Sequence, residues 1–230
     1  MSARESRDER PGPGRRQSLA ASDRRPLGTP RPTQPFADRD RAGRTDPGHF
    51  ERKYRADGDP WGYETKPYER EKYLRTLAAI GPGPFDRALE LGCSIGVFTE
   101  LLARRCHDLL ALDAAPTALT RARTRLSHAP HVRFELRDLP WELPQGPFDL
   151  IVASELLYYW DAPLLGAALP RLESMLAPGG RFVAVHWRGD VGDGPLDGDK
   201  VHVLLRERTT LRHRVNDDTA AYRLDCWELR

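Results

Sequence analysis

The stretch of sequence that decides the fold is ALELGCSIGVFTE, residues 88–100. It runs from a short apolar strand, through a turn with glycines at 92 and 96, into the start of a helix. A loop for NAD or FAD needs G-x-G-x-x-G, but this chain has Ser94 and Val97 where the second and third glycines belong. A P-loop is excluded too, because no G-K-S or G-K-T follows. The second glycine of a dinucleotide loop allows the backbone to approach a pyrophosphate closely. Because this chain lacks that glycine, the sequence predicts a nucleotide cofactor that has no pyrophosphate.

Strand and helix patterns alternate around this stretch. Short, continuously apolar strands are expected at 87–91, 109–113, 132–136, 148–153 and 181–186. Helices are expected at 96–105, from Pro116 onward, and over 162–176, where Pro170 should kink or split the helix. This alternation predicts an α/β, Rossmann-like fold with a mostly parallel, seven-stranded sheet and helices on both faces.

The last part of the chain completes that sheet. The residues APGG at 177–180 predict a turn before the fifth strand. A helix is expected near 200–208, followed by strands at 209–215 and 221–229, with the turn between them at 216–218.

Composition divides the chain into three segments. Residues 1–45 form an Arg- and Pro-rich tail with almost no large apolar side chain, so we expect it to be disordered. Residues 46–82 are rich in aromatic side chains and are expected to form a helical cap over the cofactor. The helix of this cap should end at Gly81 and bury one face, made of Tyr73, Leu74, Leu77 and Ile80. Residues 83–230 are expected to form the core.

Charge and cysteine content limit the function classes. The tail holds eleven Arg against six Asp or Glu, which leaves a formal charge of about −3 on the rest of the chain. A nucleic-acid partner is therefore not favoured. Cys93, Cys106 and Cys226 have no paired spacing, which favours a reducing cytoplasm. We expect no membrane span, because no apolar run reaches about 18 residues, and no signal peptide.

The pattern E-x-G-x-x-x-G, formed by Glu90, Gly92 and Gly96, resembles the first motif of class I S-adenosylmethionine-dependent methyltransferases. The resemblance implies that this loop wraps the methionine part of the cofactor and that the strand acid lies near its amino end. Ser94 is tolerated there because this cofactor brings no phosphate to the loop. The same resemblance nominates Cys93 as a loop residue at the cofactor.

Two acids follow at the spacing of that fold. Asp113 ends the second strand, 23 residues after Glu90, where a carboxylate can accept both ribose hydroxyls. Asp138, in LRDLP, matches the family's adenine contact, with the backbone of Leu139 beside it. Either acid has a plainer alternative as a turn or helix-cap residue. Ala114 and Ser154, at the ends of the second and fourth strands, complete the expected cofactor site.

A narrower resemblance rests on four segments: DGDPWGYETKPYEREKY, LGCSIGVFTELLARRC, FDLIVASELLYYW and LAPGG. Together they resemble the NodS-like methyltransferases, which N-methylate the free amine of a chitooligosaccharide. The resemblance covers residues 50 to about 187. It implies that Trp61, Tyr68 and Arg70 fold over the cofactor, where the Trp61 ring can face the sulfonium cation. The alternative is that Trp61 and its neighbour Tyr63 only fasten the N-terminal segment to the core.

Candidate catalytic residues lie at the ends of the fourth and fifth strands. We expect Glu155 to hold an acceptor ammonium, with Tyr158 beside it, and His186 to bind or deprotonate the acceptor, since its ring titrates near neutrality. A structural, hydrogen-bonded His186 is the open alternative. His202 is a weaker candidate. No set of residues has metal-ligand spacing, so no metal is expected.

These features together predict a methyltransferase that uses S-adenosyl-L-methionine and acts on a small molecule, most simply by N-methylation of an amine such as an amino sugar. O-methylation of a small metabolite and a non-catalytic, cofactor-binding regulatory role are the alternatives. We expect a monomer or a homodimer.

Overall fold

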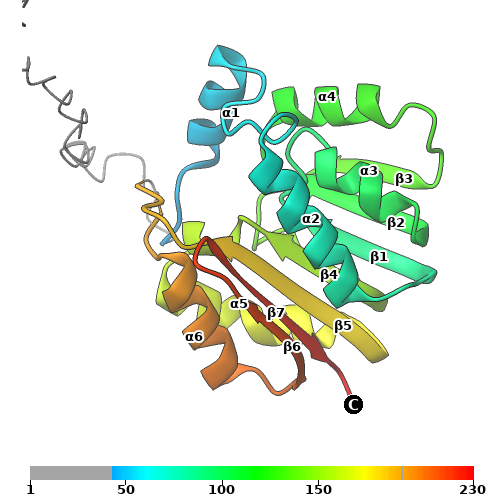
Figure 1. The fold of residues 1–230 in the computed structure, drawn as a ribbon, viewed down its shortest axis with the longest axis vertical. Coiled ribbons are helices and arrows are strands. Elements are labelled where there is room, and N and C mark those ends of the chain that lie inside the picture. The colour runs from blue at the N-terminus through cyan, green and yellow to red at the C-terminus, as the bar shows by residue number, and fades with distance from the viewer. Residues whose placement is uncertain (1–42, 193) are drawn as a thin grey trace, which may run out of the picture. The chain divides into compact units, whose positions relative to one another are not determined.

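The computed structural model describes residues 43–192 and 194–230. One seven-stranded sheet, in the order β3-β2-β1-β4-β5-β7-β6, runs through it (Figure 1). The first five strands are parallel, and β7 is antiparallel to both of its neighbours. The predicted fold class is thereby confirmed.

The elements alternate as the apolar pattern predicted. The strands are β1 (Phe85–Leu91), β2 (Cys106–Asp113), β3 (Val132–Leu136), β4 (Phe148–Ser154), β5 (Leu176–Trp187), β6 (Arg212–Asp218) and β7 (Tyr222–Glu228). The helices are α1 (Pro47–Ala56), α2 (Pro67–Ile80), α3 (Val97–Ala103), α4 (Pro116–Arg125), the short 3-10 helix η2 (Leu157–Tyr159), α5 (Ala162–Ser174) and α6 (Gly198–Arg208).

Helices cover both faces of the sheet (Figure 1). Leu165 and Leu169 of α5 and Val201 of α6 pack in one core with one side of the strands. Side chains of α2 and α3, such as Leu77 and Leu102, pack on the other side, where α4 also contacts β2 and β3. Burial on both faces explains why the central strands are continuously apolar rather than alternating.

Several helix starts are specified locally. Asp46, Asp161 and Asp197 cap α1, α5 and α6, each accepting a hydrogen bond from a backbone N–H of the first turn. Pro47 stands at the first position of α1, where its missing N–H costs nothing.

The register of the central strands brings three loops to one edge. Leu91 at the end of β1 is paired with Leu112 of β2 on one side and Ala153 of β4 on the other. The next residues, Gly92 after β1 and the last residues Asp113 of β2 and Ser154 of β4, therefore lie at the same level of one sheet edge. A ligand crevice is expected at such a place in an open α/β sheet.

Some local expectations were wrong. Helix α5 runs unbroken through Pro170, which lies on the exposed face, where water can hydrate the carbonyl that lost its partner. The segment 177–180 belongs to β5 and lies at a register shift against β4. Strand β6 extends to Asp218, so the following turn comes later than 216–218. Leu74, expected on the buried face of α2, is 54% exposed.

Residues 1–42 of the expected tail lie outside the described residues. Residues 44 and 45 are bound to the segment after β4. Arg44 forms an isolated antiparallel β-bridge with Trp160, and the Thr45 N–H donates to the Tyr159 carbonyl at 2.9 Å. Helix α1 contacts α4, and α2 packs against β5 and β7. The boundaries of a cap at 46–82 and a core at 83–230 stay predictions. Among the described residues, no helix has the length and apolar character needed to cross a membrane.

A matched pair of glycines tests how the loop after β1 is built. Gly96 and Gly179 both have left-handed backbones, with φ of 80° and 75°, but a Cβ at Gly96 would lie 3.0 Å from the Cβ of Ala122, whereas Gly179 faces open space. We expect Gly179→Ala to lower the free energy of unfolding by about 1 kcal/mol through backbone strain alone. Gly96→Ala should lose about 1–3 kcal/mol more, because it also overpacks the α3–α4 contact. Urea unfolding of both variants measures this, and equal losses would contradict it.

Candidate active site

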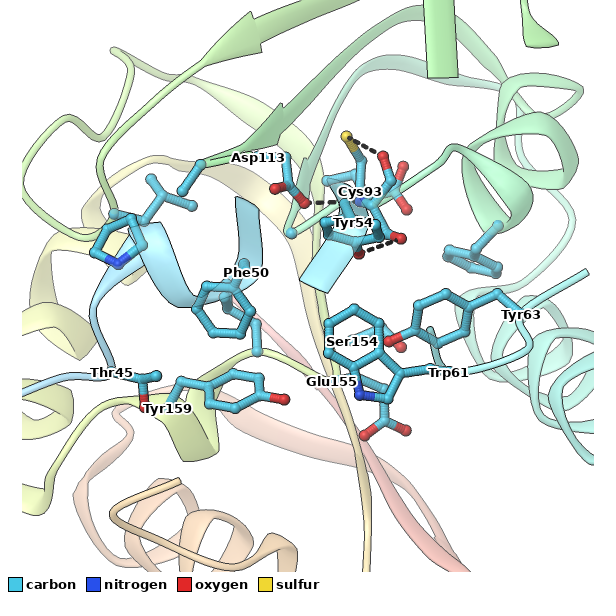
Figure 2. A pocket seen from close by; sticks show the side chains of 18 of the residues that line it. Thr45, Phe50, Tyr54, Trp61, Tyr63, Cys93, Asp113, Ser154, Glu155 and Tyr159 are labelled. Atoms are coloured by element: carbon cyan, nitrogen blue, oxygen red, sulfur yellow. Dashed lines mark hydrogen bonds between the residues drawn. The ribbon is translucent and has the colours of Figure 1, made fainter. Parts of the chain in front are cut away.

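A cavity lies at the edge of the sheet where β1, β2 and β4 end (Figure 2). Many of the predicted site residues line it: Trp61, Glu90, Gly92, Cys93, Ser94, Asp113, Ala114, Leu139, Ser154 and Glu155. The remaining wall comes from residues 44–73, from Val97 and Phe98 of α3, and from the segment after β4. The register of the sheet therefore gathers side chains that are far apart in the sequence.

Glu90 is a buried acid in the wall of the cavity. Its side chain projects from the end of β1, and the residue is only 3% exposed. Its Oε2 atom has no hydrogen-bond partner among the described residues. The neighbouring Thr99 hydroxyl is also buried without a hydrogen-bond partner among the described residues. Burial raises the pKa of Glu90 to about 8; Thr99 acts against this shift, and nearby Asp113 adds to it. A buried acceptor without a partner is costly, so this oxygen is matched to a donor that a ligand would bring.

Asp113 and Ser94 join the tip of β2 to the glycine loop. The Asp113 carboxylate accepts hydrogen bonds from the backbone N–H of Ser94 at 2.8 Å and of Ala115 at 2.9 Å. Burial still raises the pKa of Asp113 above its usual range, against those two bonds. Ser94 has a left-handed backbone, with φ of 52°, and its hydroxyl accepts from the Tyr54 hydroxyl at 2.5 Å. The loop serine thus holds α1 against the loop.

Aromatic rings form much of the cavity wall (Figure 2). Phe50 of α1 meets Tyr159 edge to face, with ring centroids 4.7 Å apart. Trp61 lies between Tyr54, at 5.2 Å, and Tyr63, at 5.8 Å. Phe50, Tyr54 and Tyr63 were not predicted as site residues, although the density of aromatic residues after position 46 was a signal. Aromatic faces attract cations and exclude water.

Glu155 is the anion at the far end of the cavity, directly after β4. Its backbone is left-handed, with φ of 54°, which is uncommon for a residue with a side chain. Oε1 accepts from the Lys72 ammonium at 2.6 Å, and Oε2 accepts from the Tyr158 hydroxyl at 2.7 Å and the Trp187 backbone N–H at 3.0 Å. Glu155 is therefore a fixed carboxylate with three donors.

Lys72 of α2 is the missed partner of this carboxylate. It is 1% exposed and lies 2.8 Å from Glu69 as well as 2.6 Å from Glu155. Burial acts to lower the pKa of Lys72, but the two carboxylates outweigh it, and the net pKa is above its usual value. An 83-residue separation along the chain hides this pair from sequence analysis.

The structure does not bring the Asp138 carboxylate to the cavity wall. Arg44 pairs with both of its oxygens, and the Arg44 guanidinium also lies 4.4 Å from the centre of the Trp141 ring. Leu139, the next residue, does line the cavity. The adenine contact predicted for Asp138 stays a prediction.

Three other predicted cofactor residues lie elsewhere. Arg70 is exposed on α2. Tyr68 stacks edge to face with Tyr222, at 6.0 Å, and lies over the Lys72 ammonium at 4.9 Å, behind the cavity. Gly96 closes the loop and starts α3, where its lack of a side chain admits Ala122.

Two of the three catalytic candidates are also set back from the cavity. Tyr158 is 5% exposed and donates its hydroxyl to Glu155. His186 is fully buried, and both ring nitrogens have protein partners: the Leu157 backbone N–H at 3.1 Å and the His202 ring at 3.1 Å. Burial, followed by the nearby His202 and Lys72, lowers the pKa of His186 well below its usual value. This geometry favours the structural alternative for His186, and the same holds for His202.

The sheet order and a cavity over the ends of β1, β2 and β4 define the class I methyltransferase fold. The crystal structure of the N-methyltransferase NodS from Bradyrhizobium japonicum WM9 in complex with S-adenosyl-L-homocysteine matches with a TM-score of 0.70 and 30% identity, covering 79% of this chain and 97% of that one. A putative methyltransferase from Pseudomonas syringae matches with a TM-score of 0.63 and 36% identity, covering 71% and 99%.

Residues 46–216 match the family model described as nodulation protein S (NodS). The chain belongs to the NodS family, which confirms the narrower resemblance seen in the sequence. Nodulation protein S of Sinorhizobium fredii (strain NBRC 101917 / NGR234) is 39% identical over 127 residues, 54% of this chain and 59% of the relative. The chain thus spans somewhat more than half the length of that relative.

The buried lysine gives a stability prediction. Lys72→Met leaves the carboxylates of Glu69 and Glu155 buried without a cation, and we expect the free energy of unfolding to fall by about 3–5 kcal/mol. Adding Glu155→Gln removes one of the stranded charges and should recover part of that loss. Urea unfolding of the single and double variants measures both effects. A double variant no more stable than Lys72→Met would show that the charge of Glu155 is not what Lys72 compensates.

Proposed function

We propose that this protein transfers a methyl group from S-adenosyl-L-methionine to an amine of a small molecule. The observation that carries the proposal is the cavity at the ends of β1, β2 and β4, in which a buried oxygen of Glu90 has no partner among the described residues. Membership of the NodS family and the N-methyltransferase named among its solved structures support the same reaction.

The residues of the cavity fit the cofactor. Its ammonium group would supply the donor that Glu90 Oε2 lacks. Asp113 has lone pairs left for ribose hydroxyls after accepting its two backbone bonds. Trp61 and Tyr54 present aromatic rings to a cation. When bound, S-adenosylmethionine supplies a methyl group on a positively charged sulfur.

The protein's contribution is orientation and exclusion of water. When a neutral amine attacks a sulfonium, the S–CH3 bond breaks as the N–CH3 bond forms, and the positive charge passes from sulfur to nitrogen. Alignment of the reactants in a dry cavity, where this dispersed charge replaces a localised one, supplies much of the acceleration. The aromatic wall formed by Phe50, Trp61, Tyr63 and Tyr159 provides that surface. The fixed carboxylate of Glu155 attracts the acceptor's ammonium form and holds it at the far end of the cavity.

We propose that the acceptor reacts as the free amine, without a protein base. Glu155 already accepts three hydrogen bonds, one of them from the Lys72 ammonium. Asp113 accepts two, and its remaining lone pairs would bind the ribose hydroxyls of the cofactor. His186 is fully buried, and its ring nitrogens are used by protein partners. The dependence of kcat/KM on pH should then follow the ionisation of the acceptor amine.

We propose a cytoplasmic protein, monomeric or homodimeric, with a small-molecule acceptor. All three cysteines are free and buried, in keeping with a reducing compartment. The formal charge of about −3 outside the tail supports a small acceptor over a nucleic acid.

A pair of acceptors tests the reaction. The tetramer of glucosamine carries free amines, and the tetramer of N-acetylglucosamine carries the same hydroxyls without them. We expect a product heavier by one methyl from the first and none from the second, by mass spectrometry. Methylation of both tetramers would indicate O-methylation. Calorimetric binding of S-adenosylhomocysteine without turnover on any amine or hydroxyl acceptor of a wider panel would favour the non-catalytic role.

Glu90 predicts a pH dependence of cofactor binding. With a pKa of about 8 in the protein alone, Glu90 is protonated at lower pH and must lose that proton to pair with the ligand's ammonium. The affinity for S-adenosylhomocysteine should therefore fall as pH drops below 8, approaching about tenfold per pH unit. Calorimetry between pH 6 and 8 measures this. Glu90→Gln should bind more weakly and lose the slope, and an unchanged slope in that variant would overturn the assignment.

A further inference from the structure

Three buried polar residues lie behind the turn that carries Glu155. His186 of β5, His202 of α6 and Asp225 of β7 are each 0% exposed. None of them lines the cavity. Burying three ionisable side chains in one place is costly unless every polar atom has a partner, so their hydrogen bonds indicate what they do.

The hydrogen bonds determine which ring nitrogen carries each proton. The backbone N–H of Leu157 can only donate, so His186 Nε2, 3.1 Å away, must accept. The proton of neutral His186 is then on Nδ1, which donates to His202 Nε2 at 3.1 Å. The proton of neutral His202 is in turn on Nδ1, which donates to Asp225 Oδ2 at 2.6 Å. These three hydrogen bonds form a chain in which every donor points toward Asp225 from His186 onward, and both rings must be neutral.

The far end of this chain is anchored by charge. Arg206 donates to both oxygens of Asp225, at 2.7 and 3.2 Å, and His213 lies 2.7 Å from Oδ1. Burial acts to raise the pKa of Asp225, but the bonds from His202 and Arg206 outweigh it, and the pKa lies below its usual range. Asp225 is therefore a permanent carboxylate, and Arg206 and His213 reach solvent.

The near end of the chain holds the turn at the acceptor side of the cavity. Leu157 begins η2, between Glu155 and Tyr159, and both of these line the cavity. Glu155 has a left-handed backbone, which persists only where neighbouring contacts hold it. Beside His186 on β5, the Trp187 N–H binds the Glu155 carboxylate. The two consecutive residues of β5 thus fasten the turn by its backbone and by its carboxylate.

We propose that His186 is a positioning residue: the chain Asp225–His202–His186 holds the turn 155–159 through the Leu157 N–H and so places Glu155 and Tyr159 for the acceptor. This rests on the proposed function for the identity of the acceptor. The chain ends on a backbone N–H rather than on a group in the cavity, so it moves no proton from the substrate.

Burial keeps both rings neutral, although the Asp225 carboxylate acts to raise the pKa of each ring. His186 faces the Lys72 ammonium of α2, the His202 ring of α6 and the Tyr158 ring of η2, whose centroid is 5.3 Å away. His202 faces the Asp225 carboxylate, which acts to raise the pKa of His202, whereas Arg223 and Arg206 act to lower it. Burial is the main cause that lowers the pKa of each ring, and these cations add to it. Protonated His186 would turn a second N–H toward Leu157 and break the chain.

A spectroscopic experiment tests the chain without any acceptor. Long-range proton–nitrogen spectra of protein labelled with 15N-histidine distinguish the protonated from the bare ring nitrogen, and His186→Asn and His202→Asn assign the two rings among the seven histidines. We expect His186 and His202 to carry the proton on Nδ1 and to stay neutral at pH 6. The Leu157 amide should exchange slowly with solvent. An Nε2–H form of His186, or titration near the ordinary value, would overturn the proposal.

A pair of variants tests the effect on catalysis, with the glucosamine tetramer as acceptor. The Gln side chain of His186→Gln can place an oxygen near the position of Nε2 and keep the bond from Leu157, whereas Asn in His186→Asn is too short. We expect the KM for the tetramer to rise about tenfold in His186→Asn, the cost of about one buried hydrogen bond, and clearly less in His186→Gln. The affinity for S-adenosylhomocysteine and the pH profile should not change in either variant.

Two results would overturn the positioning role. Equal losses in both variants, restored at high pH, would assign His186 to proton transfer. An unchanged KM in both would show that the turn does not need the chain. If neither the tetramer nor any other amine of the wider panel is methylated, the proposed function fails, while the nitrogen spectra still decide whether the hydrogen-bonded chain exists.

Discussion

The parallel pairing of β1 with β2 and β4 is the constraint from which the site follows. Parallel strands in register end at the same edge, so Glu90, Asp113 and Ser154 meet there without any specific contact among them. The loop after β1 must then turn sharply, and the left-handed backbones of Gly92, Ser94 and Gly96 make this turn. The register of the sheet therefore sets the position of the cavity, and the side chains set its chemistry.

The balance of charge in the cavity suits a cationic ligand. Glu90, Asp113 and Glu155 supply three carboxylates, and the aromatic wall adds the negative faces of its rings. The two carboxylates nearest the glycine loop have pKa values raised by burial, so the protein holds them at a cost that a positive ligand would repay. The Glu155 carboxylate accepts hydrogen bonds from Lys72 and from two further donors.

Three hydrogen bonds, one from α2 and two with β5, fasten the turn after β4. Lys72 reaches it from α2, the Trp187 N–H from β5, and His186 from β5 through Leu157. A left-handed Glu155 in a loop would otherwise be a weak point, since a residue with a side chain adopts that backbone only at a cost. Fastening the turn on one side to α2 and on the other to α6 and β7 links the acceptor end of the cavity to both layers of helices.

The sequence by itself determined the class of fold, the apolar strands that form its core, and the cofactor loop. These depend on local patterns: apolar runs, strand-end acids such as Asp113, and a glycine turn whose Ser94 excludes a pyrophosphate. It also determined the family, through segments that stay contiguous in the chain.

Only the tertiary structure decided which polar side chains meet. Lys72 pairs with Glu155 across 83 residues, and Asp225 is 39 positions beyond the His186 whose chain of bonds it ends. No local pattern marks such pairs, because a buried charge is tolerated only where folding delivers its partner. For the same physical reason His186, a reasonable base by residue type and position, is a buried link in a hydrogen-bonded chain once β5, α6 and β7 pack together.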